Sequence, residues 1–197
     1  MPSPADQPNA LILRGRGIGS RVGTLIGAGW LWYGLSFFPT VVRMPLGLLG
    51  LGIVVFLLNR SRRLLAISRQ LPAPEATARA TNRRVWKWFW LNLLIEIVLL
   101  NVAINLLVHP SQRIYWIPAI SFVVGLHFLP MARFFAVSAY WLCGGAMIGA
   151  AGLTVVGLRF GGPSSAVVGA EAVANAFILW GTAGWVMHTV LPRPGDL

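Results

Sequence analysis

Long apolar blocks recur along the chain, separated by short segments that contain arginine, proline or glycine. A helix needs ~20 mostly apolar residues to cross the hydrocarbon core of a bilayer, and most of these blocks have about that length. Helices fit such blocks because backbone groups in lipid must find their hydrogen-bond partners within the segment. The sequence therefore predicts an all-α, polytopic integral membrane bundle of about six transmembrane helices, in one domain over residues 22–190. The expected spans are residues 22–40, 44–58, 88–108, 114–132, 134–156 and 166–190.

The charge balance would suggest a nucleic-acid partner if the chain were soluble. Its 197 residues carry 16 Lys and Arg against 5 Asp and Glu, which gives a net charge of +11. However, 56% of the residues are hydrophobic and the mean hydropathy is +0.71, which is typical of membrane proteins. We therefore expect the lipid bilayer and anionic lipid headgroups as partners, and no nucleic acid. The sequence leaves open a homo-oligomer or another membrane protein as a further partner.

The positions of the basic residues predict the orientation, because cytoplasmic loops of membrane proteins carry an excess of Lys and Arg. With the amino terminus inside, 13 of the 16 basic residues lie in cytoplasmic segments, and only Arg43, Arg113 and Arg159 lie in outer loops. We therefore expect both termini in the cytoplasm. Residues 1–21 would form a basic tail that is disordered or lies on the membrane surface, and residues 191–197 a second tail.

Residues 59–87 form a basic cytoplasmic loop in this topology, with eight basic side chains and one acid, Glu75. Apolar residues among its first arginines permit a short amphipathic helix on the membrane surface. The side chains expected to contact anionic lipid are Arg60, Arg62, Arg63, Arg83, Arg84 and Lys87. The preceding block, residues 44–58, is short for a ~30 Å core, so we expect it to span fully only if Arg43 joins it by snorkelling.

Ionisable side chains at membrane depth mark candidate sites, because they are costly in lipid and need a partner or water. Glu96 lies fifteen residues before, and His127 sixteen residues after, the centre of a short loop near Ser111. Antiparallel neighbours reach equal depth at equal distances from their loop, so the two side chains can meet in the inner half of the membrane. Asn92 lies one turn from Glu96 on the same face, and Arg133 lies at the same end. These residues form the candidate intramembrane polar site.

A second candidate group lies nearer the outside and consists of two pairs of residues, each spaced by four. This candidate outer polar layer comprises Asn101 and Asn105 on the third helix, and Glu171 and Asn175 on the sixth. Two polar layers suit a gated path across the membrane. The alternative for both groups is structural, because such side chains also join helices through hydrogen bonds worth ~1 kcal/mol each.

Small residues also recur at a spacing of four, which lets helix backbones approach closely in lipid. The pairs are Gly23 with Gly27, Gly145 with Gly149, and Ala170 with Ala174. They predict a compact bundle and carry no information on function.

Motifs of the familiar intramembrane enzymes are missing from the sequence. Neither the Gly-x-Ser-Gly motif of the six-helix rhomboid proteases nor the His-Glu-x-x-His motif of zinc proteases occurs. His109, His127 and His188 are too scattered to suggest a zinc or haem site, and the single Cys143 cannot form a disulfide within one chain. The sequence therefore predicts no metal site and no cofactor, and it gives no support to an enzyme.

The segment GLHFLPMARFF, residues 125–135, resembles a Gly-x-His-Phe-Leu-Pro motif of small bacterial multi-span membrane proteins that are grouped as a domain of unknown function. The resemblance covers about residues 83–150. Further positions that match its pattern are Arg83, Arg84, Trp86, Glu96, Ala139 and Tyr140. The resemblance implies a bacterial inner-membrane location and implies no activity.

Proline within this motif removes one backbone hydrogen bond of the fourth helix. Pro130 therefore either leaves a free carbonyl beside His127, as an ion or proton site, or ends the helix before Arg133.

The sequence leaves three functions open, of which a lipid-modifying or redox enzyme has no motif in its favour and the other two rest on particular residues. The first is a small transporter or permease-like protein in which Glu96 and His127 exchange a proton and the outer polar layer forms an access path. The second is a non-catalytic assembly factor, sensor or partner subunit that uses the basic loop of residues 59–87 to bind lipid or another protein. The first requires uptake that depends on pH and is lost on Glu96→Gln substitution.

Overall fold

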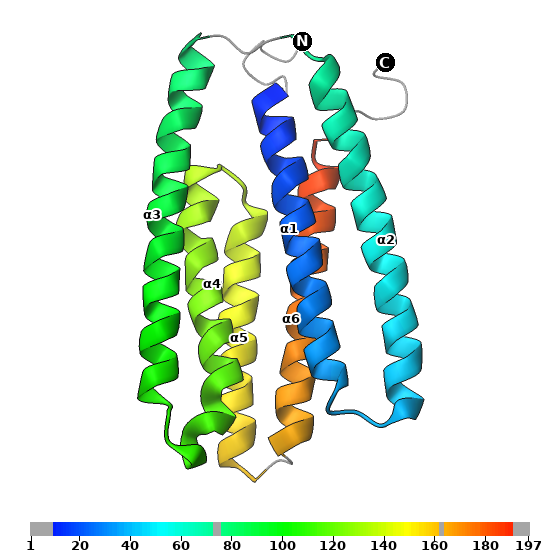
Figure 1. The fold of residues 1–197 in the computed structure, drawn as a ribbon, viewed down its shortest axis with the longest axis vertical. Coiled ribbons are helices and arrows are strands. Elements are labelled where there is room, and N and C mark those ends of the chain that lie inside the picture. The colour runs from blue at the N-terminus through cyan, green and yellow to red at the C-terminus, as the bar shows by residue number, and fades with distance from the viewer. Residues whose placement is uncertain (1–9, 73–75, 162–163, 191–197) are drawn as a thin grey trace.

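The chain is described by a computed structural model, which covers residues 10–72, 76–161 and 164–190, with side chains described for all of these except residues 76–82. This part of the chain is helical and contains no strand (Figure 1), so the predicted fold class is confirmed. The α-helices are α1 (Ala10–Leu35), α2 (Thr40–Gln70), α3 (Ala76–Leu106), α4 (Trp116–Phe134), α5 (Ala139–Arg159) and α6 (Ser164–His188). A short 3-10 helix, η2 (Pro110–Tyr115), precedes α4.

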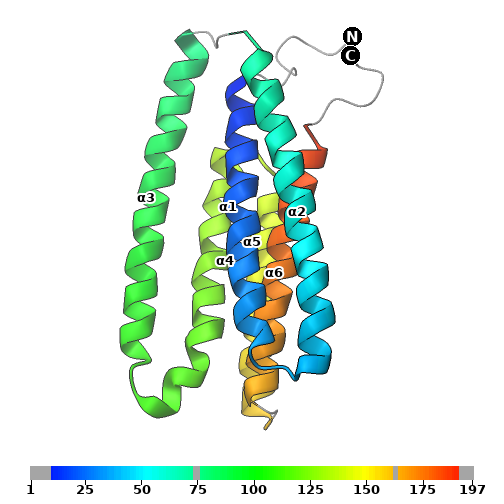
Figure 2. The same ribbon diagram turned by 45° about the vertical axis from the view of Figure 1, so that its right-hand side comes forward.

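Successive helices run in opposite directions (Figures 1 and 2). α1 packs against α6 and α2, α4 packs against α5 and α3, and α5 packs against α6 to join the two groups. α2 and α3 therefore form the outer edges of the bundle, and α3 rests mainly on α4. The starts of α1 and α3 and the end of α2 lie at one end of the molecule, which we call the basic end.

Within the described part of the chain, five segments are long and apolar enough to cross a membrane, and they correspond to α2, α3, η2 with α4, α5, and α6. The molecule is thus a multi-pass helical membrane bundle. α1 is not among these segments, since Arg14, Arg16 and Arg21 lie in its first half and glycines recur in its second half. It still belongs to the bundle, since it packs against both α2 and α6.

The largest cluster of buried apolar side chains lies where α1, α2 and α6 meet. It contains Leu13, Leu31, Leu35, Leu57, Leu64, Ala176, Trp180, Ala183, Met187 and Val190. The indole nitrogen of Trp180 donates a hydrogen bond to the backbone oxygen of Thr24 at 3.0 Å, which joins α6 to α1 inside this core.

The amino-terminal tail predicted for residues 1–21 is shorter in the structure, because α1 begins at Ala10. Residues 1–9 lie outside the described residues. Leu13 is buried, and Arg21 donates from Nε to the hydroxyl oxygen of Ser61 on α2 at 2.8 Å. Hydropathy marks only the lipid-facing part of a helix, so it could not reveal that this polar part packs against α2.

The second helix is much longer than the block of residues 44–58 that was expected to span. α1 ends at Leu35, and α2 begins after Pro39, whose backbone is extended and interrupts the helix. Arg43 donates to the backbone oxygens of Leu35 at 3.0 Å, Ser36 at 3.2 Å and Phe38 at 3.0 Å. Carbonyls at a helix end lack partners in their own helix, so Arg43 caps α1 and does not need to snorkel.

The basic loop predicted for residues 59–87 is mostly helical and does not form a helix lying on the membrane surface. Its first part continues α2 to Gln70, and its last part is the start of α3 from Ala76. Leu64 and Ser68 are buried, so this part of α2 still packs on the bundle. Leucine, alanine, glutamine and arginine favour helix in water as well, which explains why the helices continue past their apolar blocks.

Glycines bring two pairs of helices into backbone contact. A Cβ atom added to Gly144 on α5 would lie 2.6 Å from the backbone oxygen of Gly125 on α4. One added to Gly34 on α1 would lie 2.9 Å from the backbone oxygen of Gly169 on α6. Both distances are too short for a side chain, so these crossings require glycine.

Most of the small-residue pairs predicted from four-residue spacing do not mark such crossings. A Cβ atom added to Gly23, Gly145 or Gly149 would meet no neighbouring atom within 4 Å. Gly27 is the exception, since its Cβ would lie 2.6 Å from Trp180. The spacing identifies a helix face with small side chains, but it cannot tell whether that face meets a helix or lipid.

Candidate intramembrane site

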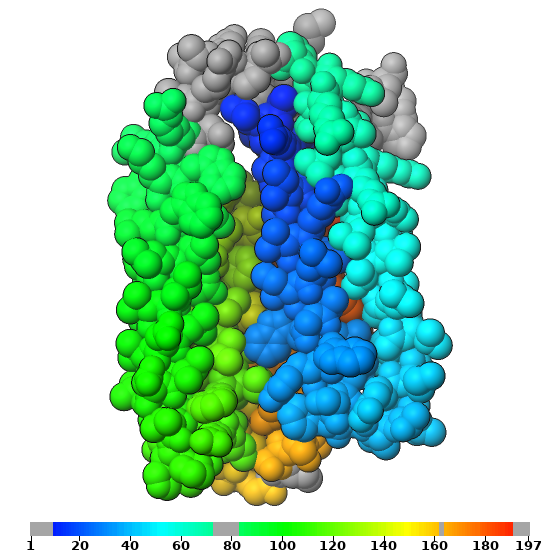
Figure 3. Space-filling view, viewed as in Figure 1, coloured from blue at the N-terminus to red at the C-terminus, as the bar shows by residue number. Residues whose placement is uncertain are grey.

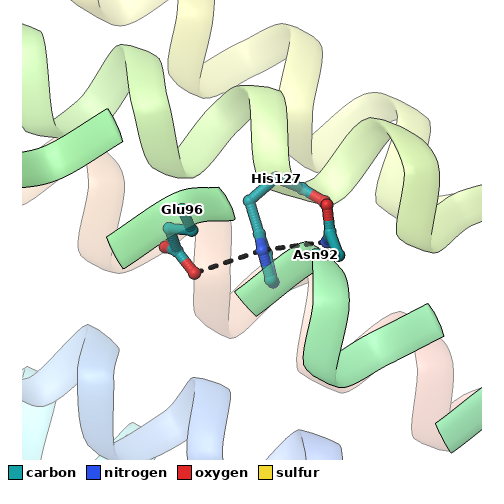
Figure 4. A network of polar contacts seen from close by, with 3 residues as sticks. All are labelled: Asn92, Glu96 and His127. Atoms are coloured by element: carbon teal, nitrogen blue, oxygen red, sulfur yellow. Dashed lines mark hydrogen bonds and ion pairs between the residues drawn. The ribbon is translucent and has the colours of Figure 1, made fainter. Parts of the chain in front are cut away.

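Glu96 and His127 meet between α3 and α4. The short connection through η2 makes the two helices antiparallel neighbours and sets both side chains at the same depth. His127 Nδ1 lies 3.1 Å from Glu96 Oε2, and both side chains point into the space between the two helices (Figure 4). A carboxylate and an imidazole at this distance can share one proton.

Asn92 completes the group by binding His127 twice. Its amide nitrogen Nδ2 lies 2.9 Å from His127 Nδ1 and donates to the backbone oxygen of His127 at 3.0 Å. An Asn amide nitrogen carries two hydrogens, so its bond to the backbone oxygen can persist in every protonation state of the imidazole. Asn92 therefore fixes the position of His127 relative to α3.

His127 Nδ1 faces two rival partners, and this gives the group two proton arrangements. When Nδ1 carries a hydrogen, it can donate to the Glu96 carboxylate at 3.1 Å. When Nδ1 is bare, it can accept from Asn92 at 2.9 Å or from a protonated Glu96. The same positions of the nitrogen and oxygen atoms are therefore compatible with a proton on His127 Nδ1 or on Glu96.

The group lies in a groove rather than in a closed core. A cavity of about 320 Å³ lies between α3 and α4 and contains Asn92, Glu96 and His127 in its wall. The remaining lining is apolar and consists of Trp88, Leu91, Ile95, Leu99, Val123, Leu126, Pro130 and Phe134. The side chains of Glu96 and His127 keep 13% and 9% of their surface exposed, so a small molecule or water can reach them.

Two aromatic side chains meet in the part of the groove wall nearest the basic end. Trp88 on α3 stacks against Phe134 on α4 with ring centroids 5.6 Å apart. α4 continues past Pro130 to Phe134, so the proline does not end the helix near His127. Pro130 instead lies in the groove wall, where its missing hydrogen bond weakens α4 locally.

Arg133 does not join Glu96 and His127, contrary to the sequence prediction. It is exposed in the last turn of α4. Among the described residues, the ion pair of Glu96 is with His127. Arg133 is six positions after His127, which is more than one and a half turns or about 9 Å farther along α4.

The four residues of the predicted outer polar layer lie in two separate places. Asn101 and Asn105 are exposed on α3, and their amides donate to backbone oxygens of their own helix at 2.8 and 2.7 Å. Glu171 and Asn175 are buried on α6, with 4% and 0% of their surface exposed. Since α3 rests on α4 at the edge of the bundle and α6 lies in its interior, no common layer forms.

Two hydroxyl side chains accompany Glu171 and Asn175 and were not predicted from the sequence. The amide of Asn175 donates to the hydroxyl oxygen of Ser121 on α4 in a short contact. Ser121 and, on α5, Thr154 are buried near the Glu171 carboxyl group. Neither makes a hydrogen bond of normal geometry to it. Serine and threonine are common in membrane helices, so their presence alone gives a weak signal.

Most of the basic side chains predicted to contact anionic lipid are exposed at the basic end. Arg62 and Arg63 are exposed on α2, and Arg83, Arg84 and Lys87 are exposed on α3. Arg60 differs, since it is half-buried and its Nε atom has no hydrogen-bond partner in the part of the chain that the structure describes. Within the described residues, no group of three or more His, Cys, Asp or Glu side chains could hold a metal ion.

Comparison with known proteins gives no relative from which a function could be taken: no family model, curated protein or solved structure matches this chain.

Proposed function

We propose that this protein is a small membrane transporter in which Glu96 and His127 bind and release a proton. The observation that carries the proposal is the contact of 3.1 Å between these side chains at the wall of a groove that remains accessible. A purely structural pair would be expected in a closed contact between helices. Glu96 and His127 are the titratable groups among the residues that line the groove.

The groove favours a small cationic compound with a large apolar part. Its walls are apolar apart from Asn92, Glu96 and His127, and its volume of about 320 Å³ is at the lower end of ligand pockets. When His127 is neutral and Glu96 is ionised, the groove carries one negative charge in a medium of low polarity. A cation is the natural counter-ion there.

Proton and substrate would then compete for the same carboxylate. Protonation of Glu96 removes the negative charge, so the cation leaves. Release of that proton restores the charge, so the next cation binds. His127 would accept the proton at Nδ1 and return it to Glu96, while Asn92 holds His127 in place. Exchange of one proton for one cation follows from this competition.

The alternating directions of the helices give weaker support to the transporter proposal. α1–α3 and α4–α6 each contain three helices and begin at opposite ends of the bundle. Many secondary transporters are built from two such halves of opposite orientation.

Transport by the purified chain in liposomes tests the proposal. Ethidium, a fluorescent cation with a large apolar part, is added outside liposomes whose interior is more acidic. We expect uptake that depends on the pH gradient and is lost in Glu96→Gln, because glutamine has the same shape but cannot take a proton. Asn101→Leu is the matched control on the exposed side of α3 and should transport normally. Uptake by Glu96→Gln at the rate of the natural protein would disprove the role of the carboxylate.

A second function is favoured by the exposed arginines of the basic end. α2 and α3 extend there past the ends of α4 and α5 (Figure 1). We propose that this end faces the cytoplasm, with both termini on that side and the protein in a bacterial inner membrane. The arginines of α2 and α3 would then bind anionic headgroups or an acidic partner protein.

A further inference from the structure

The interior of the bundle contains a second polar group, formed by Glu171, Asn175, Ser121 and Thr154. It lies between α4, α5 and α6, toward the end opposite the basic end (Figure 1). All four side chains are buried, with between 0% and 4% of their surface exposed. The group shares no residue with the groove of Glu96 and His127.

Several oxygen atoms in this group lack a partner. Both carboxylate oxygens of Glu171 and the side-chain oxygen of Asn175 are buried and have no hydrogen-bond partner among the described residues. Glu171 and Asn175 are four residues apart on α6, so these oxygens lie on one face of the helix. Buried polar atoms without partners are rare in proteins, because each one costs ~1–3 kcal/mol.

No described cation pairs with Glu171. Among the described residues, the ion pair formed is that of Glu96 with His127. The nearest basic residue of α5, Arg159, is exposed at the end of that helix. A carboxylate in this position must therefore either carry a proton or have a bound cation as its partner.

We propose that Glu171, Asn175, Ser121 and Thr154 form a binding site for Na⁺. Carboxylate, amide and hydroxyl oxygens are hard ligands, which suit alkali and alkaline-earth cations. The single carboxylate favours a monovalent ion, because a divalent ion would leave an excess positive charge in the interior. All four side chains are buried in the bundle interior, so we expect the smaller Na⁺ to bind in preference to K⁺. This site is separate from the proposed proton exchange and does not depend on it.

The ion would hold three helices together. Glu171 and Asn175 belong to α6, Ser121 to α4 and Thr154 to α5, so one ion would bind groups on each of them. Contacts between α4 and α6 are few compared with those between α4 and α5, and the site bridges this weaker boundary. Binding should therefore stabilise the folded bundle.

Binding of ²²Na⁺ to the full chain in detergent, with the melting temperature measured in parallel, tests this proposal. We expect one ²²Na⁺ per chain, and a saturable rise in melting temperature in NaCl relative to choline chloride at equal ionic strength. KCl should give a smaller rise. Equal melting temperatures in NaCl, KCl and choline chloride, without ²²Na⁺ binding, would overturn the proposal and show that Glu171 is held as a neutral acid.

Variants separate ion binding from damage to the fold. Glu171→Gln removes the charge but keeps the shape, so it should lose ²²Na⁺ binding and be at least as stable as the natural chain in choline chloride. Thr154→Val removes one ligand and should weaken binding at least tenfold. Glu96→Gln changes the other membrane carboxyl group and should bind ²²Na⁺ normally. Full binding by Glu171→Gln would contradict the assignment.

Discussion

The side-chain amide of Asn92 is one of the links that hold α3 to α4. Asn92 is the one buried residue among the side chains described for α3, with 9% of its surface exposed. It binds both the imidazole and the backbone oxygen of His127. Most of the other side chains on this helix are apolar and lie toward lipid or line the groove. The position of Glu96 relative to His127 therefore depends on Asn92.

Replacing Asn92 tests this dependence. Asn92→Leu removes both hydrogen bonds and should lower the free energy of unfolding by about 1 kcal/mol, since hydrogen bonds between membrane helices are individually modest. It should also change the ¹⁵N signals of the His127 ring, because Nδ1 loses one of its partners. Unfolding in mixed micelles and NMR of histidine-labelled protein measure the two effects.

Asn101→Leu is the comparison for that experiment. Asn101 binds only its own helix and is exposed, so leucine there should leave the His127 signals unchanged and should not lower stability. If both variants gave the same His127 spectrum as the natural chain, Asn92 would not orient the imidazole.

For single residues, the sequence predicts a contact where the connection between two helices sets the depth of both side chains. The short connection between α3 and α4 is enough to predict that Glu96 and His127 lie at the same depth, and the four-residue spacing places Asn92 beside them. Arg133 shows the limit, because membership of the same helix end does not determine whether a side chain points into the groove. Ser121 and Thr154 could not be selected, because hydroxyl groups in membrane helices often bind only their own backbone.

Among the helices, α4 and α5 have the closest backbone contact described above. Gly125 and Gly144 face each other across it. Helices in lipid associate through packing and hydrogen bonds, so a close crossing contributes more to their pairing than apolar area does.

A pair of neighbouring glycines on α5 allows a matched test. Gly144→Ala places a Cβ 2.6 Å from the Gly125 backbone oxygen, so the helices must separate. We expect a loss of about 1–3 kcal/mol of stability, as for other overpacked contacts. Gly145→Ala meets no atom within 4 Å and should change stability by no more than about 0.5 kcal/mol. Unfolding in mixed micelles measures the stability of both variants. Equal losses of stability would show that a change in helix flexibility, and not the contact with Gly125, causes the effect.

The helices themselves could be predicted from the apolar blocks, but their ends could not. Hydropathy reports which residues prefer lipid, whereas a helix ends where its backbone hydrogen bonds end. α1 begins twelve residues before the predicted span of residues 22–40, and α2 extends to Gln70. In both cases, polar residues that favour helix continue the hydrogen-bond pattern beyond the apolar block. Packing between α1 and α2 then stabilises these extensions, and one sequence alone does not reveal this packing.

The whole molecule is asymmetric along its length. α2 and α3 contain 31 residues each, which corresponds to about 46 Å of helix against a hydrocarbon core of ~30 Å. Figure 3 shows α3 and α2 on opposite flanks of this view, with a recess between α3 and α1. α2 and α3 extend past the ends of α4 and α5 at the basic end, and arginines on both helices are exposed there.

The contribution of these arginines to lipid binding can be measured in nanodiscs. Replacing Arg62, Arg63, Arg83 and Arg84 with Gln should strongly reduce the enrichment of fluorescent phosphatidylglycerol around the protein, because each surface cation contributes about 1 kcal/mol of attraction to an anionic leaflet. The control replaces Arg113 and Arg159 at the other end and should have a smaller effect. If the enrichment of phosphatidylglycerol were unchanged in the fourfold variant, these arginines would serve only to orient the protein in the membrane.

The edge position of α3 has consequences for how the chain is made. Ribosomes complete α3 before α4, and until α4 follows, Asn92 and Glu96 have no partner in the membrane. Only residues 107–115 separate the two helices, so α4 reaches the insertion machinery almost at once. We expect α3 and α4 to enter the bilayer together as a helical hairpin, with His127 already beside Glu96. A chain that lacked His127 would expose a lone acid in lipid during synthesis, and quality-control proteases would then remove it before it could be assayed for any activity.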